Sequence, residues 1–134
     1  MTTRQFHTLL LAATLSLMIM LAACGTEPNQ QLGEQDRRVP NGNPDTGKRL
    51  AAYWGCGTCH RIPGVEGADS LVGPPLDGYQ QRQYIAGVLT NNADNLIAWI
   101  HNPQAIQPGN AMPNVGMSEE EARHIAAYLY TLTR

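Results

Sequence analysis

The feature that most limits what this chain can fold into is one pentapeptide, Cys56-Gly57-Thr58-Cys59-His60. In this C-x-x-C-H pattern, two thiols three positions apart can reach the two vinyl groups of one porphyrin, and the adjacent imidazole can reach the iron. The pattern is typical of covalent haem c attachment. The chain has only one Phe, two Trp and five Tyr in 134 residues. A bound macrocycle would therefore supply much of the apolar area that a small core needs.

Two other interpretations of the same cysteines were weighed. A redox-active dithiol is expected within a thioredoxin-like βαβ arrangement, and no strand-like alternating run is present. A zinc site needs two further ligands. Downstream of the motif only His101 and His124 could serve, and no second C-x-x-C pair exists. The haem interpretation is favoured over both.

The first 23 residues are predicted to be a signal peptide rather than part of the fold. Leu9–Leu21 is an apolar run of 13 residues after a segment with one cation, whereas a membrane-spanning helix needs roughly 20 apolar residues. Leu21-Ala22-Ala23-Cys24-Gly25 resembles the bacterial lipoprotein signal, which implies cleavage after Ala23 and lipid on Cys24. The alternative is an ordinary secretory signal followed by a chance cysteine. If Cys24 carries lipid, all three cysteines of the chain have a use.

Downstream of the signal, composition predicts one tether and one domain. Residues 24–43 lack helical or strand periodicity and contain Pro and Gly, so they are interpreted as a flexible tether. Residues 44–134 form the predicted domain, without an internal repeat. Charged residues make up 15% of the chain and the formal net charge is −2. These values exclude a polybasic nucleic-acid-binding protein.

The periodicity predicts a small all-α domain. Helices are expected from Pro44 to about Tyr53, over Gln81–Thr90, from Asn92 or Asp94 until Pro103 ends the helix, and from Glu119 to about Thr133. The stretch between His60 and Gly78 is rich in Gly and Pro and is predicted to be loop. In the last helix Ile125, Tyr128, Leu129 and Leu132 form one apolar face.

A second iron ligand is predicted at Met112. Met112 lies in Pro108-Gly109-Asn110-Ala111-Met112-Pro113, where Pro prevents helix and a loop can present a thioether to a haem face. Met117 directly precedes the capping box that begins with Ser118, so its predicted role is apolar packing before the helix. Ligation by His101 or His124 in place of Met112 is the less favoured alternative.

The order and spacing of these motifs resemble class I cytochromes c. The segments that carry the resemblance are Cys56–His60, Gly73–Gly78, Trp99–Pro103, Pro108–Pro113 and the closing helix. Finer details, including Ile62-Pro63-Gly64 and Asn95–Trp99, are similar to the haem domain fused to subunit II of bacterial haem–copper oxidases. Here that domain would stand alone on a lipid anchor.

The resemblance implies roles for further residues. The carbonyl of Pro74 is expected to accept the N–H of the His60 imidazole, and Leu76 is expected to pack on the porphyrin. Arg82 and Asn110 are candidates for contacts with the propionates, and Trp99 is a candidate to turn its indole N–H toward the pocket. One departure concerns the first helix. The family usually places an aromatic residue four positions after its glycine, here Gly47, and this chain has Ala51, for which Tyr53 or Trp54 could compensate.

The predicted function follows from the two axial ligands. With His60 and Met112 on the iron, no position remains for a substrate, so the resemblance implies a monohaem electron carrier, not an enzyme. The expected partners are a haem–copper oxidase, an upstream electron donor and, through lipid, a bacterial membrane facing the periplasm or cell exterior. No nucleic-acid partner is expected. The alternative is a haem enzyme or gas-binding haem protein whose distal Met is easily displaced.

Overall fold

The structure, a computed structural model, describes residues 37–133. The predicted signal peptide, Cys24 and the greater part of the predicted tether lie outside the described residues. Among the residues described, no helix combines the length and the apolar character needed to cross a membrane.

Helix α3 (Pro44–Tyr53) begins where the sequence predicts. The Asn43 side chain accepts a hydrogen bond from the Thr46 N–H at 2.9 Å, and Pro44 occupies the first turn, where its missing N–H costs nothing. Gly55 follows in the left-handed region with φ 69°, which only glycine adopts readily, and the 3-10 turn η1 (Cys56–Thr58) comes directly after it.

Two helices occupy the middle of the chain where one was predicted. In α4 (Ala93–His101) the Asn92 side chain caps the helix by accepting from the Asn95 N–H at 2.9 Å. The helix ends before Pro103, as expected, but Pro103 then begins a second short helix, α5 (Pro103–Ile106). A proline that ends one helix is also favoured at the first position of the next.

The prediction of a helix over Gln81–Thr90 is wrong. The chain instead forms the 3-10 turn η2 (Tyr79–Gln81) and an antiparallel hairpin of β1 (Tyr84–Ile85) and β2 (Leu89–Thr90). Ala86 and Gly87 form the turn with φ 49° and 77°, both left-handed. Two successive left-handed residues form a type I′ turn, which reverses the chain and excludes a helix.

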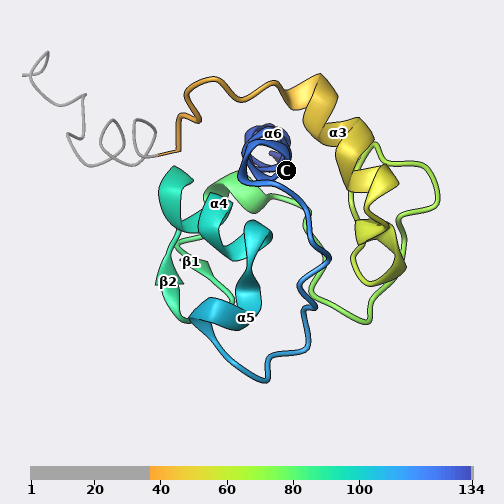
Figure 1. The fold of residues 1–134 in the computed structure, drawn as a ribbon. Helices are drawn as coiled ribbons and strands as arrows, with labels where there is room; N and C mark the ends of the chain where they lie inside the picture. Colours follow the sequence, from red (N-terminus) through yellow and green to blue (C-terminus); the bar gives the residue numbers. More distant parts are fainter. Residues whose placement is uncertain (1–36, 134) are drawn as a thin grey trace, which may run out of the picture. The chain divides into compact units, whose positions relative to one another are not determined.

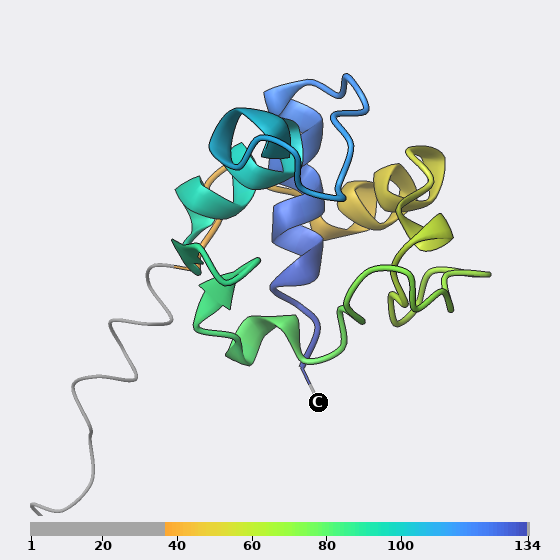
Figure 2. The ribbon, with the colours of Figure 1, turned by 90° about the horizontal axis from the view of Figure 1, so that it is seen from below.

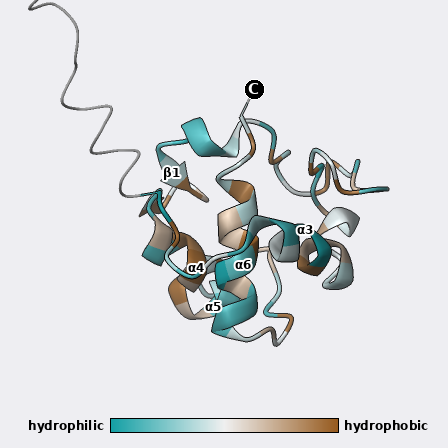
Figure 3. Cartoon of the chain, turned by 90° about the horizontal axis from the view of Figure 1, so that it is seen from above, coloured by the Kyte–Doolittle hydropathy of each residue, from teal (hydrophilic) through white to brown (hydrophobic). Residues whose placement is uncertain are grey.

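Helix α6 (Glu119–Leu129) begins at the predicted capping box and ends earlier than predicted. The Ser118 hydroxyl accepts from the Glu121 N–H at 3.2 Å, and the Glu121 carboxylate accepts from the Ser118 N–H at 2.8 Å. Its acidic residues face outward and its apolar residues are buried, and Figure 3 shows both kinds along the helix. Leu132 is buried although it lies beyond the helix.

Helix α6 occupies the centre of the domain, with α3 on one side and α4 on the other (Figures 1 and 2). The contact with α3 is very close at Gly47, because a Cβ atom there would lie 1.9 Å from the carbonyl oxygen of His124. Only glycine allows the two helix backbones to approach this far. Residues 37–43 also contact the domain, since Val39 packs on the core and the Asn43 N–H donates to His124 Nδ1 at 3.0 Å.

The resemblance to class I cytochromes c leads us to expect an aromatic residue where this chain has Ala51, and in the structure a different residue makes the aromatic contact. Ala51 is fully buried, and Tyr53 is 77% exposed, so the Tyr53 ring does not take the place of a buried aromatic residue. Trp54 packs on the core, and its indole N–H donates to Glu121 Oε1 at 3.2 Å. Trp54 is therefore the aromatic residue that connects the end of α3 to α6.

Candidate haem-binding site

An apolar cavity of about 410 Å³ lies inside the domain and is lined by residues from distant parts of the sequence. Its volume is in the ordinary range of ligand pockets, about 300–1,000 Å³. Eight of the predicted site residues line it: Cys56, His60, Pro74, Leu76, Arg82, Trp99, Asn110 and Met112. Cys59 lines an adjoining hollow of about 240 Å³ that shares Cys56, His60 and Met112 as walls. The fold thus brings the predicted residues of the domain to one place.

The imidazole of His60 is oriented by the loop that begins at Gly73. His60 Nδ1 lies 2.7 Å from the carbonyl oxygen of Pro74, which can only accept, so Nδ1 carries the proton. The predicted hydrogen bond to Pro74 is therefore present, and Nε2 is left with the free lone pair that a metal requires. A Cβ atom at Gly73 would lie 2.6 Å from His60 Cε1, so glycine is needed for the ring to fit against this loop.

Both cysteines carry free thiols in the structure. Neither Cys56 nor Cys59 forms a disulfide. Burial raises the pKa of the Cys56 thiol, whereas redox-active dithiols depend on a lowered thiol pKa. Within residues 37–133 no group of three or more His, Cys, Asp or Glu side chains is placed to hold a metal ion.

Both methionines of the domain line the cavity, but they are held differently. Met112 is half-buried in a loop without helix or strand, between α5 and α6. Met117 is 3% exposed and directly precedes the Ser118 cap, as expected for apolar packing. Its carbonyl oxygen also accepts from His101 Nδ1 at 2.9 Å.

The remaining wall combines apolar side chains with one cation. Leu76 packs against the core from its edge. Trp99 is 8% exposed, and its indole N–H donates to no other residue of the described chain, which leaves it available to a ligand. Arg82 donates to the carbonyl of Pro75, and its guanidinium carbon lies 5.2 Å from the centre of the Tyr79 ring. The cavity wall therefore offers a positive charge suited to a carboxylate.

Asn110 is engaged with the protein backbone. Its Nδ2 donates to the carbonyls of Pro103 at 3.0 Å and Gln107 at 2.7 Å, and its Oδ1 accepts from the Met112 N–H at 2.8 Å. Both amide hydrogens are thus in use within the loop. Asn110 lines the cavity as predicted, and its contacts in the structure are those of a residue that shapes the Met112 loop.

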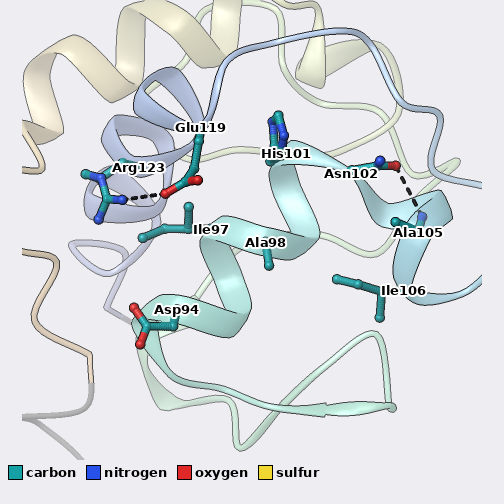
Figure 4. A pocket seen from close by; sticks show the side chains of 9 residues that line it. All are labelled: Asp94, Ile97, Ala98, His101, Asn102, Ala105, Ile106, Glu119 and Arg123. Atoms are coloured by element: carbon teal, nitrogen blue, oxygen red, sulfur yellow. Dashed lines mark hydrogen bonds and ion pairs between the residues drawn. The ribbon is translucent and has the colours of Figure 1, made fainter.

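The two downstream histidines lie away from this cavity. His101 lines a separate, open hollow of about 480 Å³ between α4, α5 and the start of α6, together with Asp94 and the Glu119–Arg123 ion pair (Figure 4). His124 Nδ1 accepts from the Asn43 N–H. Neither histidine is among the residues that line the cavity beside His60.

The residues present fit a covalently bound haem. The cavity is apolar, the free thiol of Cys56 and an imidazole with a free Nε2 line it from one segment, the free thiol of Cys59 lines the adjoining hollow, and a thioether lines the cavity from another segment. A mostly helical domain with this set of groups defines a c-type cytochrome.

Comparison with known proteins identifies the family. The profile described as Cytochrome c matches residues 44–133, and this chain belongs to the cytochrome c family, whose members bind haem c covalently. The chain is also 37% identical over 107 residues to cytochrome c oxidase subunit 2 of Alkalihalophilus pseudofirmus, covering 79% of this chain and 27% of that protein. Similar matches of 31% are found with cytochrome c oxidase subunit 2 of Bacillus sp. (strain PS3), over 58% of this chain and 23% of that protein, and of Bacillus subtilis, over 62% and 24%. This chain spans about a quarter of the length of these relatives.

Sequence reasoning missed some residues of the site. Tyr79 lines the cavity beside Arg82, although its position between the predicted loop and the next predicted helix gave no signal of burial. Gln104 makes three hydrogen bonds to the Met112 loop. An uncharged amide one residue after the proline of Asn102-Pro103 could have been suspected of a backbone contact, but its partners could not be read from spacing.

Proposed function

We propose that this protein is a membrane-tethered electron carrier that donates electrons to, or is associated with, a respiratory haem–copper oxidase. Bound haem c supplies reversible one-electron exchange between Fe(III) and Fe(II). The observation that carries the proposal is that one apolar cavity is lined both by Met112 and by an imidazole already oriented through Pro74.

Residues of this chain would bind the haem, ligate its iron and shield the cavity from water. Cys56 and Cys59 would hold the haem covalently through their sulfurs, and His60 Nε2 and the Met112 thioether would both ligate its iron, which would leave no position for a substrate. A neutral thioether ligand favours the ferrous state and raises the potential. Leu76 and Trp99 exclude water from the cavity, and Arg82 pairs with a propionate.

Association with an oxidase is supported by the identity of the relatives. All three are cytochrome c oxidase subunit 2, and the similarity reaches well into the domain that contains Cys56–His60. We infer that this chain provides a haem domain to such an oxidase and that an upstream donor reduces it.

The membrane attachment rests on the sequence alone. Cys24 in Leu21-Ala22-Ala23-Cys24-Gly25 would carry the lipid after cleavage of residues 1–23, and several acyl chains on one cysteine give firm anchoring. The domain would then stand in the bacterial cell envelope, facing the periplasm or the cell exterior.

The cofactor and ligands are tested on protein made in a host that matures c-type cytochromes. We expect the mass of the processed polypeptide, with whatever lipid it carries, to be increased by one haem, and we expect no change in the visible spectrum when carbon monoxide is added to the reduced protein. Met112→Ala is expected to bind carbon monoxide at once. A colourless product with the mass of the polypeptide alone contradicts haem attachment. Prompt binding by the unaltered protein supports the alternative of a ligand-binding haem protein.

The anchor and the partner need separate experiments. Cys24→Ser is expected to move the protein from the membrane to the soluble fraction, and continued retention contradicts lipid attachment at Cys24. Mild solubilisation of native membranes followed by capture of this protein is expected to recover haem–copper oxidase subunits. Their absence under conditions that preserve the oxidase contradicts a stable association.

A further inference from the structure

The loop that carries Met112 is tied to helix α5 by the side chain of Gln104. Gln104 Nε2 donates to the carbonyl oxygens of Asn110 at 2.9 Å and Met112 at 2.8 Å, and Gln104 Oε1 accepts from the Gly109 N–H at 3.0 Å. Both amide hydrogens and the amide oxygen are thus used on one short stretch of backbone. Gln104 itself is held in α5, which the Asn102 side chain caps by accepting from the Ala105 N–H (Figure 4).

Asn110, which belongs to the Met112 loop itself, also connects this loop to α5. It donates to carbonyls at the start and end of α5, and its Oδ1 accepts from the Met112 N–H. The peptide groups on both sides of Met112 are therefore fixed, the N–H by Asn110 and the carbonyl by Gln104. We call Gln104 and Asn110 the amide pair.

Little else determines the conformation of this loop. Within the described chain, the backbone from Pro108 to Met117 takes part in one backbone–backbone hydrogen bond, from the Asn110 N–H to the Gln107 carbonyl at 3.3 Å, and none is made by the backbone from Ala111 to Met117. The loop contains no helix or strand between Ile106 and Glu119. Side-chain amides thus replace the backbone ladder that usually orders a segment.

We propose that Gln104 is a positioning residue for the axial thioether, which sets the path of the Met112 backbone before any ligand occupies the cavity. A thioether is a weak ligand. The affinity of a methionine sulfur for iron therefore depends on how little conformational freedom the methionine backbone gains when the sulfur dissociates. Gln104 lies between the helical scaffold and the ligand loop, as a supporting residue does in a preorganised site. This inference rests on the proposed function, in which Met112 is an axial ligand.

The test is Gln104→Glu in the haem-loaded protein. The carboxylate has the shape of the amide and can still accept from Gly109, but it cannot donate, and it turns an oxygen toward the carbonyls of Asn110 and Met112. Loss of two hydrogen bonds is expected to raise the affinity of the ferric protein for imidazole about tenfold or more. The ferric Met–iron absorption band is expected to weaken in parallel. Gln83→Glu, the same change at an exposed position outside the loop, is expected to match the unaltered protein.

The outcomes separate the two proposals. If Gln104→Glu binds imidazole with unchanged affinity while Met112→Ala binds it much more tightly, the positioning role is overturned and the axial role of Met112 survives. If Met112→Ala leaves both the absorption band and the imidazole affinity unchanged, the proposed function loses its ligand and this inference fails with it.

A measurement on the unaltered protein removes any dependence on how the variant folds. Amide hydrogen exchange is followed at Gly109 and Met112, whose N–H groups donate to the amide pair, and at Ala111, whose N–H has no partner in the described chain. We expect Gly109 and Met112 to exchange more slowly than Ala111 by about tenfold or more. Equal exchange rates at the three positions would overturn the proposal.

Discussion

The two walls that carry His60 and Met112 face the same cavity but are built by different means. On the His60 wall, the segment from Gly73 to Leu76 runs beside Cys59–Arg61, with Gly73 N–H donating to the Cys59 carbonyl at 2.6 Å and Leu76 N–H donating to the Arg61 carbonyl at 2.8 Å. The ring of His60 adds its own bond to Pro74. This wall is ordered by backbone contacts and by the absence of a side chain at Gly73.

The Met112 wall is ordered by side chains instead. The amide pair holds the peptide groups around Met112, and backbone bonds contribute little. The difference implies that the His60 wall is sensitive to added volume and the Met112 wall to lost hydrogen-bonding groups. Helix α3 directly precedes the His60 wall and α6 directly follows the Met112 wall, and the two helices meet closely at Gly47.

The largest loss of stability is expected from Gly47→Ala, because this change disrupts the packing of α3 on α6. The added methyl group meets the backbone of His124 at 1.9 Å, which cannot move without separating α3 from α6. We expect the haem-loaded protein to lose about 3 kcal/mol or more of unfolding free energy, measured by denaturant titration. Helix propensity alone predicts the opposite, an increase of about 0.5–1 kcal/mol in the free energy of unfolding. Unchanged or increased stability contradicts the close helix contact, and Lys48→Ala, exposed on the same helix, is the control.

A smaller effect is expected from Gly73→Ala, which acts on the His60 wall alone. The methyl group would press on Cε1 and Nδ1 of a ring that Pro74 already holds. We expect the free energy of unfolding to fall by about 1–3 kcal/mol. We also expect a changed reduction potential, with the Met–iron absorption band still present.

Gly67→Ala separates this effect from simple backbone strain. Gly67 lies in the same predicted loop with φ 72°, and a Cβ atom there meets nothing within 4 Å. We expect this control to lower stability without changing the reduction potential. A potential that shifts equally in both variants contradicts a specific contact between Gly73 and the imidazole.

The smallest effect concerns Glu121, which links Trp54, before the haem motif, to Ser118, after the Met112 loop. The N–H and hydroxyl of Ser118, and then the indole of Trp54, hold the pKa of the Glu121 carboxyl below its usual value. The unfolded chain binds this proton more readily. The stabilisation is therefore present above the ordinary Glu pKa of about 4.3 and is lost as the pH falls through the lowered pKa.

Glu121→Gln is accordingly expected to be less stable than the unaltered protein at neutral pH, with a difference that shrinks as the solution is acidified. Denaturant titrations across this pH range measure the difference. Glu120→Gln, exposed on the same turn, is expected to show little of this pH dependence. A difference that stays constant from neutral to acid pH contradicts the lowered pKa as its source.

Sequence was sufficient where a local pattern determines the structure. Asn92 and Ser118 cap their helices as predicted, because capping depends on residues within one turn. The C-x-x-C-H segment likewise predicted the position of His60 from a short run of residues, whereas the contact of His60 with Pro74 was expected only from the resemblance to class I cytochromes c.

Sequence was insufficient where distant contacts decide. Ile85, Val88 and Leu89 have helical spacing, yet the left-handed turn at Ala86 and Gly87 produces a hairpin in which Val88 is exposed and Ile85 is buried. The amide pair gave no periodic or capping signal, because its partners are main-chain groups of a loop whose path the side chains themselves determine. A pattern cannot reveal contacts of this kind.

We propose above all that His60 and Met112 are the two ligands of the haem iron. The methyl resonances of the methionines in the reduced, haem-loaded protein test this claim most directly. A methyl group seated over a porphyrin is shifted far upfield by the ring current. We predict one such resonance, lost in Met112→Leu and retained in Met117→Leu. Survival of the shifted resonance in Met112→Leu, or its loss in Met117→Leu, would contradict the claim.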